Sequence, residues 1–203
     1  MRLNNLKSIL CMEKIINKPR IAPISIDHMS QEMLGILKKI PGDGLKGKFS
    51  PINVLGTLMY NTDTLPQFLD YWVNAKLKMG FSIREQELII LRMGFLYNCN
   101  YVWKHHIPVA LEFGVAMHEI EVLKTVPLSP IFNPREEALL VLTDSLVNER
   151  NISDDLWNKY QNKLTDSEKI DLITIVSQYV VFALVNNVMR VEVESNLNEF
   201  PSL

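Results

Sequence analysis

Cysteine is scarce in this sequence, which has only Cys11 and Cys99 among its 203 residues. Two cysteines so far apart do not form the framework of a disulfide-rich secreted domain, and the simplest interpretation is a cytoplasmic protein with reduced thiols. A secretory signal is also lacking, because the apolar stretch before Glu13 is short. We regard Met12 as an alternative start, which would leave residues 1–11 outside the protein.

Charge of one sign and long apolar runs are lacking as well. The formal net charge is −2 and no segment is rich in Lys or Arg, which argues against nucleic-acid binding. No apolar run reaches the roughly 18 residues of a transmembrane helix. Residues 172–185 come nearest, but Ser177 and Gln178 interrupt them, so they predict a buried helix and no membrane span. Gly-rich phosphate loops and metal-binding His or Cys spacings are missing, so we expect no cofactor and no metal.

Strand-like alternation is missing too, and the pattern is helical almost throughout. Helix-start signals occur at Ser50-Pro51, Thr64, Ser82 with Glu85, Asn133 with Glu136, Ser153, and Thr165 with Glu168. Helices are expected at residues 30–40, 51–60, 65–79, 83–97, 97–114, 116–124, 135–149, 154–164 and 166–190. Pro19 and Pro23 favour an extended N-terminal segment. The sequence therefore predicts an all-α fold, with an arm at residues 1–25 and one helical domain at residues 26–203.

The segment "YNCNYVWKHHIPVALEFG" at residues 97–114 holds Cys99 and two of the four histidines. Helical residues three, four and seven apart share a face. The face that starts at Cys99 is apolar and continues through Val102, Trp103, His106, Val109, Ala110 and Phe113. We therefore expect His106 to point inward, and His105, on a more polar stripe, to lie on the surface. Cys99 lies at the helix start, where free N–H groups and the helix dipole favour a thiolate.

Glu87 places a carboxylate on an apolar stripe of the preceding helix, which continues through Ile90, Leu91 and Gly94. A buried carboxylate must find a hydrogen-bond partner or become protonated. Consecutive helices joined by a short loop pack antiparallel, and Gly94 allows a close approach. Glu87 and His106 are therefore expected to meet as a general acid–base pair. The alternative is that both are core residues with satisfied hydrogen bonds and no catalytic role.

The spacing of Glu87, Cys99, Val102 and His106 resembles the motif of the carboxymuconolactone decarboxylase and alkylhydroperoxidase D (AhpD) family, which has a second cysteine at the place of Val102. The runs "REQELIILR" and "HIPVALEFGV" are also similar to this family, and the resemblance covers about residues 20–195. It implies an AhpD-like helical bundle that assembles into dimers, trimers or hexamers. The AhpD branch uses both cysteines in a redox disulfide, whereas the decarboxylase branch implies acid–base chemistry without a cysteine pair.

We therefore expect a lyase- or isomerase-type enzyme that acts on a small, anionic organic substrate. His106 is expected to transfer the proton, Glu87 to orient it, and Cys99 to be a third candidate catalytic residue. The residues expected to shape the substrate pocket are Tyr101, Val102 and Trp103. Two alternatives stay open: a thiol-dependent peroxidase that uses Cys99 with an external thiol, and a non-catalytic helical oligomer that binds a small ligand. Replacing Cys99 would separate the enzyme hypotheses.

Residues 166–193 are apolar on nearly all sides. A helix that is hydrophobic all round must be covered all round. A bundle of this size covers one or two of those sides, so a partner subunit is expected to cover the rest. The alternative is a central helix wrapped entirely by its own chain.

Overall fold

Helices make up the framework of the protein. The computed structural model describes residues 18–38, 40, 52–128 and 130–203, and no strand occurs among them. The α-helices are α2 (Gln31–Leu37), α3 (Ile52–Leu58), α4 (Leu65–Lys78), α5 (Ile83–Leu96), α6 (Asn100–Glu112), α7 (Met117–Val122), α8 (Pro134–Asn148), α9 (Asp154–Tyr160) and α10 (Asp166–Met189). Short 3-10 turns lie at Ile26–His28, Gln161–Lys163 and Ser195–Leu197. The all-α prediction is confirmed. The signal at Ser50-Pro51, Cys11 and most of the predicted arm fall outside the described residues.

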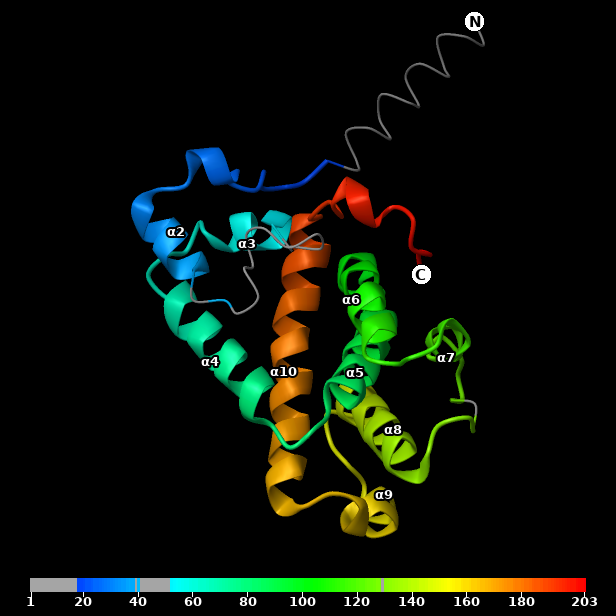
Figure 1. Cartoon of the computed structure of the whole chain (residues 1–203). Helices are drawn as coiled ribbons and strands as arrows, with labels where there is room; N and C mark the ends of the chain where they lie inside the picture. Colours follow the sequence, from blue (N-terminus) through cyan, green and yellow to red (C-terminus); the bar gives the residue numbers. More distant parts are fainter. Residues whose placement is uncertain (1–17, 39, 41–51, 129) are drawn as a thin grey trace, which may run out of the picture.

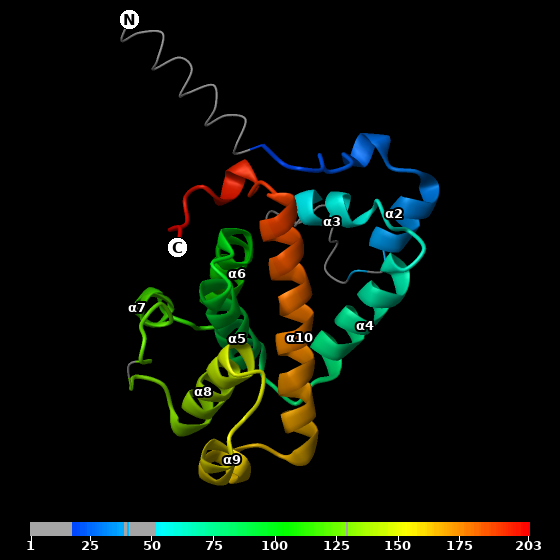
Figure 2. The same ribbon diagram turned by 180° about the vertical axis from the view of Figure 1, so that it is seen from behind.

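The long helix α10 runs through the middle of the bundle (Figure 1). It packs against α4 on one side and against α5, α6 and α8 on the other, an arrangement that Figure 2 shows from behind. By length and composition alone α10 could cross a membrane, but 44% of its apolar window is buried inside the protein. One face of α10 thus packs in the core of the bundle, as residues 172–185 predict.

The helix starts follow the capping signals of the sequence. Ser82, Asn133 and Thr165 each accept a hydrogen bond from the third residue of their helix, and the glutamate at that position bonds back to the cap. Thr64 precedes α4 as expected but makes no side-chain cap. These caps mark where each of the three helices begins.

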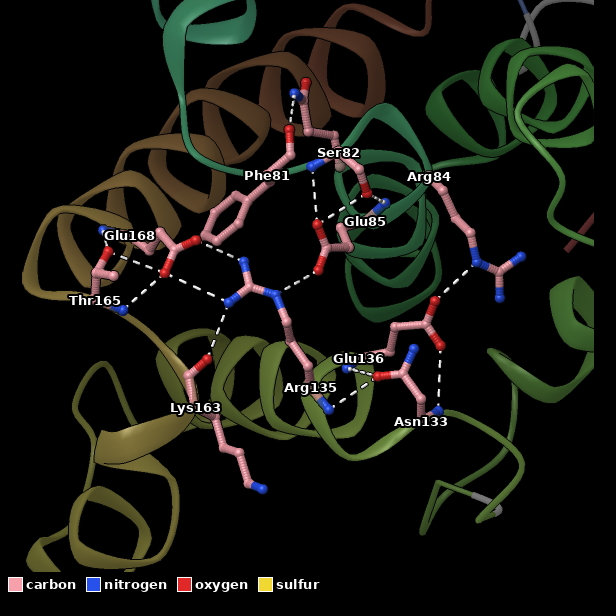
Figure 3. Close-up of polar contacts among 11 residues, drawn as sticks. Phe81, Ser82, Arg84, Glu85, Asn133, Arg135, Glu136, Lys163, Thr165 and Glu168 are labelled. Carbon is pink, nitrogen blue, oxygen red and sulfur yellow. Dashed lines mark hydrogen bonds and ion pairs between the residues drawn. The ribbon is translucent and has the colours of Figure 1, made fainter.

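Two arginines join the capped helix starts to one another (Figure 3). Arg135 donates from Nε to Glu85 of α5 at 2.6 Å and from Nη2 to Glu168 of α10 at 2.6 Å. Arg84 donates from Nε to Glu136 of α8 at 2.8 Å. Each of these glutamates therefore caps its own helix and also pairs with an arginine of another helix, which holds α5, α8 and α10 in register.

Arg135→Met is expected to weaken the fold most at neutral pH. The hydrogen bond from Arg135 lowers the pKa of Glu168 to about 2. Burial acts to raise the pKa of Glu85, but the bond from Arg135 holds it below its usual value. A depressed carboxyl pKa stabilises the fold above the unfolded pKa of about 4.3, and that stability is lost as the pH falls toward 2.

The loss at pH 7 should be about 2 kcal/mol, or roughly 4–8 °C in Tm. Urea denaturation of parent and variant between pH 7 and pH 2 measures it, with the exposed Lys78→Met as a control for loss of one positive charge. The difference between parent and Arg135→Met should shrink toward acid pH. A difference that stays constant with pH would contradict the assignment of the stability to these carboxylates.

Close contact between α5 and α6 places the candidate site. A Cβ atom on Gly94 would lie 3.2 Å from the backbone nitrogen of Trp103, so any larger residue would press the two helices apart. The connection between the helices is short and turns at Asn98, which has a φ of 47°. As the sequence predicts, the two helices therefore run side by side with their inward faces in contact.

Candidate active site

Glu87 and His106 lie in direct hydrogen-bonding contact between α5 and α6. Glu87 Oε2 is 2.5 Å from His106 Nδ1, and the Glu87 side chain is 0% exposed. The predicted meeting of these two residues is confirmed, although their catalytic roles stay predictions. A carboxylate accepts only, so Nδ1 carries the proton and Nε2 of a neutral ring keeps a lone pair.

Lys76 of α4 completes the charge balance at this pair, with its Nζ 3.2 Å from Glu87 Oε1. Burial acts to raise the pKa of Glu87, but His106 and Lys76 lower it below its usual value. Burial also lowers the pKa of His106 and outweighs the opposing effect of Glu87. At neutral pH the group is thus a lysine cation, a carboxylate and a neutral imidazole, with no net charge.

Tyr179 of α10 extends the chain of hydrogen bonds. Its hydroxyl oxygen lies 3.2 Å from His106 Nε2, and the two rings meet edge to face. Burial raises the pKa of Tyr179 to about 12, so the hydroxyl stays protonated and donates to Nε2. Neither Tyr179 nor Lys76 was expected from the sequence. The only signal for Tyr179 is that it interrupts the apolar run of residues 172–185 with a polar atom.

A cavity of about 50 Å³ lies beside His106. Its lining comes from α3, α4, α6 and α10 and consists of Val54, Leu55, Trp72, Tyr101, Val102, His105, His106, Tyr179, Phe182 and Asn186. Tyr101 and Val102, two of the residues expected to shape a substrate pocket, line this cavity, and their role in binding a substrate stays a prediction. Trp103 is not part of it, because its ring points to the opposite side of α6 and is buried in a second core with α7. No group of three or more metal-ligating side chains occurs among the residues with described positions.

Cys99 occupies the cap position of α6 but is completely buried and does not line the cavity. Burial raises the pKa of its thiol to about 11, although the N–H groups of Val102 and Tyr101 act to lower it. The expected thiolate is therefore not favoured at neutral pH. The helix start supplies the expected donors, but the loss of water around the sulfur outweighs them.

Treatment with mild peroxide is not expected to form an intramolecular disulfide. The protein should reduce the peroxide only slowly. Val102 stands where a second cysteine would be needed, and the Cys99 thiol is neutral and buried. Thiol titration before and after treatment measures the outcome, with urea-unfolded protein as the control for full reactivity. Loss of two thiols per chain, in a product that runs as a monomer on a non-reducing gel, would instead identify Cys11 as a partner.

His105 is buried, contrary to the expectation of a surface residue. Its side chain is 7% exposed and its Nε2 lies 2.6 Å from Glu194 Oε2. Glu194 follows α10 and also accepts hydrogen bonds from the Tyr101 hydroxyl at 2.9 Å and from the Asn53 backbone at 2.8 Å. The C-terminal segment thus covers the polar stripe of α6, and helical periodicity alone gives no sign of a contact so distant in sequence.

Comparison with known proteins agrees with this arrangement. Residues 64–144 match the Carboxymuconolactone decarboxylase family, whereas no sequence of a curated protein matches the chain. The debrominase Bmp8 shares the fold at a TM-score of 0.71 and 13% identity, covering 87% of this chain and 93% of its own. A cysteine-to-alanine variant of it has been solved in complex with 2,3,4-tribromopyrrole.

Two further solved structures carry AhpD in their names. A protein of unknown function from Agrobacterium tumefaciens, named as a candidate AhpD antioxidant defence protein, aligns at a TM-score of 0.62 and 16% identity, covering 68% of this chain and 94% of its own. An AhpD-core, peroxidase-related protein from Ralstonia eutropha aligns at 0.64 and 18% identity, covering 71% and 78%. Residues 64–144, which carry Glu87, Cys99 and His106, are thus similar to the carboxymuconolactone decarboxylase family, and the chain has the AhpD-like fold.

Proposed function

We propose that this protein is an enzyme that uses Glu87 and His106 as an acid–base pair on a small organic substrate, in lyase- or isomerase-type chemistry. The observation that carries the proposal is the hydrogen-bonded chain from Lys76 through Glu87 and His106 to Tyr179, which ends at the wall of a cavity. A cytoplasmic location is part of the proposal, because two cysteines so far apart in the sequence are typical of a protein with reduced thiols.

The geometry suits proton transfer at His106 Nε2. The Glu87 carboxylate holds the ring in the tautomer with a lone pair on Nε2 and stabilises the imidazolium that forms when a proton arrives. Lys76 keeps Glu87 ionised. Because the Tyr179 contact with Nε2 is long, at 3.2 Å, the hydroxyl either relays the proton or turns aside for the substrate.

The cavity lining favours a largely apolar substrate body. Most of the lining residues are aliphatic or aromatic, and no Lys or Arg occurs among the described ones. The lining therefore offers no lysine or arginine that could pair with the anionic substrate expected from the sequence, since Lys76 lies behind Glu87. The complex of the debrominase Bmp8 with 2,3,4-tribromopyrrole supports a small organic molecule as the ligand class for this fold.

Hydrogen exchange in heavy water tests the proposal even where the product is unidentified. Carboxymuconolactone and a panel of small carbonyl metabolites are incubated in D₂O with the protein, and deuterium uptake or consumption is followed by mass spectrometry. General acid–base catalysis contributes about 10²–10⁴-fold, so His106→Gln should lose activity by that factor. The exposed His28→Gln is the matched control. Undiminished turnover in His106→Gln would contradict the proposal.

The thiol-dependent peroxidase alternative finds support in the names of two structural neighbours but in no feature of this site. Cys99 is buried, neutral and absent from the lining of the cavity. Cys99→Ala should therefore keep the acid–base activity and abolish any residual peroxide reduction. A ligand-binding role without catalysis would appear as saturable binding of a panel compound with no turnover.

A further inference from the structure

Trp72 presents an unpaired hydrogen-bond donor at the cavity beside His106. Its Nε1 is buried and makes no hydrogen bond of ordinary length with a described residue. The indole N–H lies near the Tyr179 hydroxyl and acts to lower the pKa of that group, but this contact is too long to satisfy the donor. The indole lines the cavity and is held edge to face against Phe182 at a centroid distance of 5.3 Å. A buried N–H without a partner is unfavourable, so native proteins rarely keep one unless a ligand or water pairs with it.

Asn186 of α10 presents an unpaired acceptor on the same cavity. The side chain is 3% exposed, and its Nδ2 donates to the Phe182 carbonyl at 2.8 Å. The Oδ1 atom is buried and unpartnered within the described part of the chain. Exchanging Oδ1 and Nδ2 would set oxygen against the Phe182 carbonyl oxygen, so the amide orientation is fixed. Asn186 and Tyr101 also line a neighbouring, more polar groove of about 650 Å³.

Position distinguishes Trp72 from the other buried indole. Trp103 Nε1 is also buried without a partner in the described structure, but Trp103 belongs to the apolar core on the far side of α6. An unpaired indole N–H alone therefore does not mark a binding site. Trp72 instead lines the same cavity as Asn186, whose oxygen is an unpaired acceptor, and as the Tyr179–His106 pair.

We propose that this cavity binds a small, neutral carbonyl compound that also carries an N–H or O–H donor. The carbonyl oxygen accepts from Trp72 Nε1, and the ligand's donor pairs with Asn186 Oδ1. A cavity of about 50 Å³ leaves room for only a few non-hydrogen atoms beside His106. The binding mode deepens the proposed function, because it names the substrate class of the same site.

The chemistry that follows is proton removal next to a carbonyl. The C–H bond breaks, its proton passes to His106 Nε2 directly or through Tyr179, and its electron pair moves to the carbonyl oxygen. Trp72 N–H stabilises that oxygen as charge develops on it. Return of the proton to a second atom of the ligand completes an isomerisation that needs no other reactant. Trp72 is thus assigned as a further catalytic residue, and Asn186 as a residue that sets ligand specificity.

Nuclear magnetic resonance of the three indole N–H groups tests the binding mode without requiring turnover. Acetamide, which carries both an acceptor and a donor, is titrated into ¹⁵N-labelled protein, and Trp72→Phe identifies the Trp72 signal. The Trp72 proton should move downfield and saturate, while Trp103 and Trp157 stay in place as internal controls. Equal, non-saturating shifts of all three signals would overturn the proposal. A Trp72 signal that does not respond to acetamide would overturn it as well.

Acetone, which has the acceptor but no donor, tests the role of Asn186. It should bind about five to ten times more weakly than acetamide, because the Asn186 oxygen stays unpaired. Asn186→Leu should remove this preference and leave the Trp72 response to acetone intact. Equal affinities for both probes in the parent protein would overturn the role of Asn186. His106→Gln should still bind acetamide, so loss of turnover with retained binding separates failure of the proposed function from failure of this inference.

Discussion

Replacing Glu87 with alanine is expected to lower the free energy of unfolding by about 3–5 kcal/mol and to remove proton-transfer activity. The variant would leave the half-buried Lys76 ammonium without its carboxylate and the Nδ1 proton of His106 without its acceptor, beside the fully buried position of Glu87. Each kcal/mol corresponds to roughly 2–4 °C in Tm for a chain of this length, so melting should fall by about 6–20 °C.

Glu87→Gln is the informative companion variant, because it keeps the shape and an acceptor for His106 but removes the charge. It should be less destabilised than Glu87→Ala and still lose about 10²-fold or more in turnover, since nothing then stabilises the imidazolium. Calorimetry measures the stability, and the deuterium-exchange assay measures the activity. If Glu87→Ala melted at the same temperature as the parent, the placement of Lys76 and His106 would not depend on Glu87.

Sequence periodicity located the central pair because each residue breaks the pattern of its own helix. Glu87 is a carboxylate on an apolar stripe, and His106 is an imidazole on another. The capping boxes at Ser82 and Thr165 were equally local signals, since they need only residues within one turn. Short-range chemistry therefore predicts the helices, their faces and the meeting of two consecutive helices.

The rest of the site depends on contacts between segments that are distant in sequence. Lys76 and Tyr179 reach Glu87 and His106 from α4 and α10, and no periodicity relates these helices to one another. His105 was misplaced for the same reason, because the segment that carries Glu194 covers it only in the folded chain. The helix dipole favours a thiolate at Cys99, whereas the complete burial that keeps the thiol neutral is a property of the surrounding core.

The chain itself covers only part of the apolar surface of α10. Ile170, Ile173, Val181, Leu184 and Val188 are 40–64% exposed in the described structure. Their spacing places them on one face of the helix, opposite the face that packs in the core. Ser177 interrupts this apolar stripe, but a soluble protein still rarely leaves so many apolar side chains on one helix face uncovered. We propose that a second copy of this chain covers it, since a stripe on a helix pairs with its own copy about a two-fold axis.

Light scattering at micromolar concentration is expected to give a mass that is a multiple of 23.4 kDa. Leu184→Lys places a charge at the centre of the exposed stripe, which a paired interface would have to bury, and it should reduce the mass to that of one chain. The matched control is Val126→Lys, because Val126 is also an exposed apolar residue but lies in the loop after α7. It should leave the mass unchanged. A parent protein that already scatters as a single chain would mean that α10 keeps its apolar face in water, and the partner-subunit argument would fail.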